Sequence, residues 1–367
     1  MSKGQSPPGV DELEVSIFGP GKGEAIAVHL GGGDWLTVDS CIDQVSRRHP
    51  VLDYLRAIGV DVENRLKVVI ATHAHNDHVA GIAELYKEAK AAKFVMSSAM
   101  ASEEFLMAVE ADADVERYTT QSVLVEYRAV FAEAERRGRD PKGLKPLRRA
   151  MEQQVVWNHP GTHSHVSADV RALSPSHEAV TRASTALARS LAVAGQTRRL
   201  AASDPNEFAV SLWIETVHAA ILLGGDLTRG PTGCGWHAVL ATHDPSQRAS
   251  LFKIPHHGSP NAHHEGVWTN LVTSDVISAI APYRAGRNPR PNEEDINRIS
   301  SLSGSVFVTA PTSVPKPSDS IRKSRRELGA VADNVREPWG RVGHVRARKR
   351  LDNPWRVDTA RPAKRVS

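Results

Sequence analysis

The stretch His73-Ala74-His75-Asn76-Asp77-His78 places four side chains that can bind a metal within six residues. It follows the apolar run Lys67 to Ala71, which is typical of a buried strand, and it precedes a segment with helical spacing. His73 and His75 project to the same side if the segment is extended, while Asp77 and His78 lie where the chain turns. This pattern suits two metal ions about 3.5–4 Å apart. Helix capping, the simpler explanation, requires one such residue and not four.

Two later segments have the same form, a hydrophobic strand that ends in candidate ligands. The first reads Leu222-Leu223-Gly224-Gly225-Asp226, and the second runs from Phe252 to Pro255 and then reads His256-His257-Gly258-Ser259. Taken alone, each segment is weak evidence. An Asp after glycines is usually a turn residue, and a single pair of adjacent histidines is not specific. The pair His263-His264 also shows that adjacent histidines occur here without an evident role. The specific signal is the order of the three segments.

This ordered set resembles the metallo-β-lactamase fold superfamily, and within it the hydrolase domain of ComEC-type DNA-uptake proteins. That branch reads His-x-His-x-Asp-His, then a strand ending in Gly-Asp, then His-His-Gly-Ser, as this chain does. The resemblance spans about residues 13–310 and includes Asp39 and Asn206. It implies an α/β fold, the four-layer αββα sandwich of that superfamily.

The resemblance also implies a ligand set for two divalent ions. His73 and His75 would bind the first ion, Asp226 would bridge the two, and the second would be held by Asp77, His78 and His256. Zinc is expected from the imidazole-rich set, and manganese is the alternative. The ions would activate a bridging water. Asp77, His257 and Ser259 are the candidate catalytic residues, the last two beside the ligands and able to contact substrate.

The sequence departs from the family pattern in two places. Most members supply a third histidine to the first ion, and the matching segment here offers His177, with His163 and His165 as other candidates. Where the ComEC-type branch often shows Gly-His-Pro, this chain has Pro289-Arg290-Pro291. Arg290 could bind a phosphate of the substrate through two hydrogen bonds, or it could be a solvated loop residue.

The resemblance implies a hydrolase domain over about residues 13–310, which leaves an extension over 311–367. Strands at both ends of the domain with helices between them indicate a layered α/β architecture. Residues 101–154 read as a helical insertion, with Leu124, Tyr127 and Phe131 on one stripe and a second helix carrying Leu147 and Met151. The extension is rich in Pro, Ser and Arg, so we expect it to be loosely ordered.

Composition limits the possible classes of protein. The chain has 367 residues and 40% hydrophobic content, enough for a sizeable core, and its two cysteines cannot form a disulfide framework. No apolar run approaches the ~18 residues of a membrane span. The first twelve residues do not resemble a signal peptide, so we expect a cytoplasmic protein without membrane contact.

The charge is uneven along the chain. Residues 341–367 hold nine basic and two acidic residues, whereas the whole chain has a net charge of only +4. Such a tail could bind nucleic acid, or it could serve only solubility.

The first functional hypothesis is a metal-dependent phosphodiesterase, in particular a nuclease. The alternatives are a hydrolase of small carbonyl compounds (lactone, thioester or β-lactam) on the same fold, and a non-catalytic metal-binding partner module.

Overall fold

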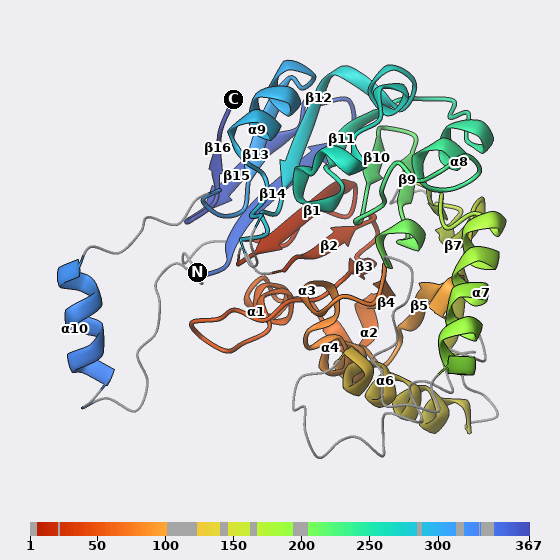
Figure 1. The fold of residues 1–367 in the computed structure, drawn as a ribbon. Coiled ribbons are helices and arrows are strands. Elements are labelled where there is room, and N and C mark those ends of the chain that lie inside the picture. The colour runs from red at the N-terminus through yellow and green to blue at the C-terminus, as the bar shows by residue number, and fades with distance from the viewer. Residues whose placement is uncertain are drawn as a thin grey trace.

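A computed structural model describes residues 6–20, 23–100, 123–139, 146–161, 167–193, 205–284, 288–312, 319–329, 331 and 341–367. Two eight-stranded sheets form its centre, and helices cover their outer faces (Figure 1). The α/β sandwich predicted from the sequence is confirmed. Among the described residues, no helix is long and apolar enough to cross a membrane.

The first sheet has the strand order β15-β14-β1-β2-β3-β4-β5-β6. Its five strands from β15 to β3 pair antiparallel, and the pairs from β3 to β6 are parallel. The central strands are rich in β-branched residues, as in Leu-Lys-Val-Val-Ile-Ala of β4. The strand bounds are β1 Glu12–Gly19, β2 Ala25–His29, β3 Trp35–Val38, β4 Leu66–Ala71, β5 Lys93–Ser97, β6 Leu147–Ala150, β14 Gly343–Arg350 and β15 Arg356–Ala360.

The second sheet has the order β16-β13-β12-β11-β10-β9-β8-β7. Strands β10 to β13 pair parallel, and the remaining pairs are antiparallel. The parallel pairs matter for function, because the carboxyl ends of parallel strands meet at one edge of a sheet. The strand bounds are β7 Gln154–His159, β8 Ala168–Ala172, β9 Leu212–Thr216, β10 Ala220–Leu223, β11 Ala249–Lys253, β12 Val272–Ile280, β13 Ser305–Val308 and β16 Lys364–Arg365.

The three largest apolar clusters among the described residues hold the layers together. One lies between the two sheets and includes Ile70 and Ile214. Another packs α1 (Pro50–Ala57), α4 (Ile82–Glu88) and α6 (Val123–Gly138) on the first sheet, and a third packs α8 (Gly235–Thr242) and α9 (Glu293–Ser301) on the second. The other helices are α2 (Val62–Arg65), α3 (Asn76–Val79), α7 (His177–Val193) and α10 (Asp319–Gly329).

The expectation of a loosely ordered C-terminal extension is wrong for residues 343–365. Strand β14 pairs with β1 along its full length, and β16 extends the second sheet. Apolar residues alternate with basic ones in β14, so Val345 and Ala347 face the apolar core while the arginines face the other side. Arg348 lies 2.7 Å from Glu14, and both are buried. Partnered charge, rather than solvation, explains the basic composition of this strand.

The predicted helical insertion over residues 101–154 is correct only in part. Helix α6 contains the expected stripe of Leu124, Tyr127 and Phe131, but the second helix carrying Leu147 and Met151 is wrong. Residues 147–150 form β6, which pairs parallel with β5, and β7 begins at Gln154. Pairing with an existing sheet outweighs local helix propensity here. Residues 101–122 and 140–145 of the predicted insertion lie outside the described part of the chain.

Candidate metal centre

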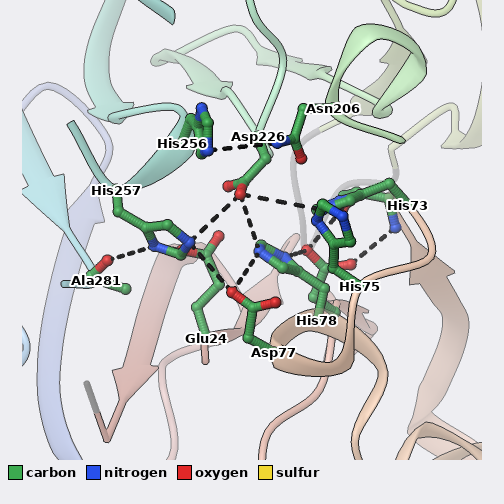
Figure 2. A network of polar contacts seen from close by, with 12 residues as sticks. Glu24, His73, His75, Asp77, His78, Asn206, Asp226, His256, His257 and Ala281 are labelled. Carbon is green, nitrogen blue, oxygen red and sulfur yellow. Dashed lines mark hydrogen bonds and ion pairs between the residues drawn. The ribbon is translucent and has the colours of Figure 1, made fainter. Parts of the chain in front are cut away.

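The candidate site lies where β3, β4, β10, β11 and β12 end. Each strand is followed by polar side chains: Asp39 after β3, residues 72–78 after β4, and Asp226 after β10. His256 and His257 follow β11, and Tyr283 follows β12. Figure 2 shows the side chains of His73, Asp77, His78, Asp226 and His257, which come from three of these segments, pointing toward one another.

Three histidines present the same ring nitrogen to the centre of the site. Nδ1 of His73 bonds Oγ1 of Thr72 at 2.9 Å, and Nδ1 of His78 bonds Asp39 at 2.6 Å. Nδ1 of His257 bonds the carbonyl oxygen of Ala281 at 2.8 Å. These bonds leave each Nε2 directed at the cluster, the arrangement that metal-binding histidines commonly show.

Asp226 is the common neighbour of the three imidazoles. Its Oδ2 lies 3.3 Å from Nε2 of His78, 3.3 Å from Nε2 of His257 and 4.0 Å from Nε2 of His73. Asp77 approaches the same imidazoles from the other side, with its Oδ2 3.3 Å from His257 and 3.6 Å from His78. The predicted convergence of residues 73–78 with Asp226 is therefore present.

The glycines before Asp226 explain how its carboxylate reaches the site. Gly225 has a φ of 53°, and a Cβ at this position would lie 2.6 Å from the carbonyl oxygen of Val210. Any other residue would be strained in this left-handed conformation and would also collide with the neighbouring backbone. The chain can therefore turn tightly between β10 and Asp226.

The cluster concentrates opposite charges in a buried place. Burial favours the neutral form of His257, but the carboxylates of Asp226 and Asp77 outweigh this and raise its pKa to about 10. Burial likewise opposes charge on His78, yet Asp226, Asp39 and Asp77 raise its pKa well above the ordinary value. The imidazoles of His78 and His257 therefore hold protons that a cation would displace on binding, whereas burial lowers the pKa of His73 and keeps its imidazole neutral.

The donor set fits a divalent ion. Nε2 of His78 and Oδ1 of Asp226 are buried and have no hydrogen-bond partner among the described residues. Unpaired buried polar atoms of this kind mark places where an ion or water belongs. Two groups of candidate ligands meet in the cluster, His73 with His78 and Asp226, and Asp77 with His78 and His257.

The adjacent histidines His256 and His257 lie in positions opposite to those predicted. The structure places His257, not His256, against Asp226 and Asp77. His256 points away and contacts Asn206 at 3.3 Å and Asn261 at 2.9 Å. Both residues have a positive φ, 45° and 52°, so the backbone coils and directs the second imidazole inward. The predicted position of His256 in the cluster is therefore wrong, and His257 occupies that position.

The first ion position lacks the predicted third histidine among the described residues. His75 lies beside His73, with 3.0 Å between Nδ1 of His75 and Nε2 of His73. His177 is exposed at the start of α7, where its backbone N–H donates to Glu152, so it is not part of the cluster. Its place in the sequence motif was misleading because a new helix begins there. His163 and His165 lie outside the described residues.

Two other predicted site residues stand beside the cluster rather than in it. Arg290 pairs with the buried carboxylate of Asp295 at 2.7 Å. Ser259 follows the His256–Gly258 turn, and its backbone N–H donates to the carbonyl oxygen of His256. Among the described residues, Ser259 has no hydrogen bond or ion pair to the clustered side chains.

Sequence reasoning missed two residues of the site. Tyr283 is half-buried, and its ring stacks on His257 with 5.3 Å between centroids. Glu24, at the start of β2, lies beneath the cluster with its Oε2 3.7 Å from Nδ1 of His257. No spacing rule links either residue to the histidine motifs.

Comparison with known proteins agrees with the architecture. Residues 20–179 match the family model of the metallo-beta-lactamase superfamily, a range that includes Asp39 and the residues 73–78. No curated protein matches the sequence.

Solved structures are similar at low sequence identity. The metallo-beta-lactamase fold protein YhfI from Bacillus subtilis has a TM-score of 0.41 and 12% identity, covering 83% of this chain and 98% of that one. The metallo-beta-lactamase SMB-1 bound to 2-mercaptoethanesulfonate has a TM-score of 0.33 and 14% identity, with 68% and 79% coverage. Zn²⁺-bound PqqB from Methylobacterium extorquens has a TM-score of 0.31 and 13% identity, with 63% and 59% coverage. Nothing about substrate follows from these similarities.

Proposed function

We propose that the chain is a metal-dependent hydrolase that cleaves phosphodiester bonds, with nucleic acid as its substrate class. The observation that supports this most is the convergence of buried imidazoles and carboxylates at one edge of the sandwich (Figure 2). The order of the three motifs, which is similar to that of ComEC-type hydrolase domains, favours phosphodiesters over carbonyl compounds.

Six side chains would hold two divalent ions, zinc or manganese. When bound, such ions make a water acidic enough to attack near neutral pH and neutralise charge on the scissile group. The first position would use His73 and His75, the second would use Asp77, His78 and His257, and Asp226 would serve both.

Asp77 is the carboxylate best placed to exchange protons with solvent. Its side chain is 17% exposed, whereas those of Asp226 and Asp39 are 2% and 1% exposed. Burial opposes its ionised form, but His78 and His257 lower its pKa below the usual range. A carboxylate that stays ionised can orient the attacking water by accepting a hydrogen bond from it.

Substrate contacts would come from groups around the cluster. Tyr283 would present its aromatic ring or hydroxyl to the substrate beside His257. In the C-terminal region, Arg341, Arg361 and Lys364 are exposed and form no ion pair among the described residues, so we propose them for contacts to a nucleic-acid backbone. Arg348, which is paired with Glu14, is not available for this.

The test is a cleavage panel with Zn²⁺ or Mn²⁺ on single- and double-stranded DNA and RNA, and on carbonyl esters, lactones and β-lactams. We expect nucleic-acid cleavage by the wild type, its loss in His75→Ala, and normal activity in His177→Ala, whose imidazole is exposed on α7. Intact nucleic acids with unchanged behaviour of His75→Ala would refute the proposal. Turnover of carbonyl compounds alone would favour the small-molecule alternative.

A further inference from the structure

Glu24 is a buried carboxylate directly beneath the cluster. Its relative exposure is 1%, and its backbone N–H donates to the carbonyl oxygen of Asp77 at 3.0 Å. The preceding Gly23 has a φ of 143°, and a Cβ there would lie 2.6 Å from the same carbonyl oxygen. The chain therefore passes beneath Asp77 as closely as a backbone can, and this brings the Glu24 side chain to the site.

Neither carboxylate oxygen of Glu24 has a hydrogen-bond partner among the described residues, and its ion pair with Lys253 runs through Oε2. Oε2 lies 2.8 Å from Nζ of Lys253, a fully buried residue of β11 in the opposite sheet. Oε1 is buried and accepts no hydrogen bond among the described residues, as is also true of Oδ1 of Asp226. A buried polar atom without a hydrogen bond costs about 1–3 kcal/mol, so a further positive group beside Lys253 would stabilise this carboxylate.

The spacing of the side chains is that of a cation site. Two groups of three residues meet this spacing, in that one ligand atom from each residue lies within 4.8 Å of the other two. The groups are Glu24 with Asp226 and His257, and Glu24 with Asp39 and His78. Atoms about 2.0–2.2 Å from a common ion lie at most about 4.4 Å apart, so small rotations of the side chains would suffice. Figure 2 shows Glu24 on the same side of the cluster as His257.

We propose that Glu24 is a further metal ligand, with Lys253 holding Oε2 so that Oε1 faces the ion beside Asp226 and His257. The second ion position then has three carboxylates against two imidazoles. Such an oxygen-rich set suits manganese better than the imidazole-rich set inferred from the sequence motifs. The inference rests on the metal centre of the proposed function and is independent of which bond is cleaved.

Metal affinity of Glu24→Gln tests this directly. Calorimetric titration of the metal-stripped protein with Mn²⁺ and Zn²⁺ gives the affinities, and the visible spectrum of bound Co²⁺ reports changes in the ligand set. Glu14→Gln is the matched control, because Glu14 is equally buried in the adjacent strand and also pairs with a buried cation, Arg348, at 2.7 Å. We expect Glu24→Gln to lose at least ~10-fold more Mn²⁺ affinity than Glu14→Gln, with an altered Co²⁺ spectrum. A smaller difference or an unchanged spectrum overturns the inference.

Glu24→Gln leaves Lys253 buried without its partner, which could prevent folding. The double variant Glu24→Gln/Lys253→Met removes both charges, so we expect it to fold and to keep the loss of Mn²⁺ affinity. Wild-type affinity in the double variant overturns the inference. Absence of binding to the wild-type protein overturns it together with the metal centre, whereas tight binding without nuclease activity counts against the proposed substrate alone.

Discussion

The adjacent residues His256 and His257 allow a stringent comparison of metal affinity between two alanine variants, because the imidazole of His257 faces the cluster and that of His256 does not. In His257→Ala, the second ion position loses a donor whose Nε2 lies 3.3 Å from both Asp226 and Asp77. Removing even a residue that only supports a ligand typically lowers metal affinity 10–100-fold. We therefore expect His257→Ala to lower Zn²⁺ or Mn²⁺ affinity at least ~100-fold, or about 2.7 kcal/mol.

His256→Ala is the matched control. Its imidazole contacts Asn206 and Asn261, and its ring centroid lies 6.0 Å from that of His257, with no ion pair to Asp226 or Asp77 among the described residues. Its φ of 45° is close to the 52° of His257. Alanine is therefore strained to a similar degree at either position, and the difference between the variants isolates the ligand. Calorimetric titration of metal-stripped proteins measures both affinities, and we expect less than ~3-fold change for His256→Ala. An equal or larger loss in His256→Ala would refute the assignment.

Two further predictions concern stability, each measured by denaturant unfolding. Arg348→Met leaves the buried Glu14 carboxylate unpaired and should cost about 3–5 kcal/mol, whereas Arg350→Met, on the exposed end of the same strand, should cost at most about 1 kcal/mol. Equal small losses would mean that β14 is not part of the folded core. Burial, with Arg346 and Arg348 nearby, lowers the pKa of His344 to about 3. Below pH 6.5 the unfolded chain therefore binds a proton at this position that the folded protein does not, and stability should fall by about 2 kcal/mol at pH 5 from this group alone. His344→Phe should flatten this dependence; an unchanged slope would contradict the assignment.

The sequence predicted best those site residues that directly follow a buried strand. Residues 73–78 and Asp226 each follow a buried strand, and parallel strands that end at one edge bring such residues together. The choice between His256 and His257 could not be made in this way, because it depends on two consecutive residues with positive φ. Glu24 was missed because its role depends on contact with Lys253 across the two sheets.

The fold was predicted less well in β14, where the many basic residues favoured a loosely ordered tail over a strand. In β14 the alternation of Val345 and Ala347 with basic residues is a strand signature. Its arginines were assigned to a loosely ordered basic tail, because the acidic partner of Arg348, Glu14, is more than 300 positions away in the sequence. The short strand β6 could not be recognised either, since pairing with β5, rather than its own sequence pattern, determines its conformation.

The most direct test of the metal centre is a crystal structure of the protein prepared with Mn²⁺ or Zn²⁺, with anomalous diffraction data. We expect an anomalous peak about 2.0–2.3 Å from the ligand atoms of Asp226, His78 and His257. A peak at another group of histidines, such as His237 and His264, would contradict the central claim. The absence of any peak at full metal saturation would contradict it as well.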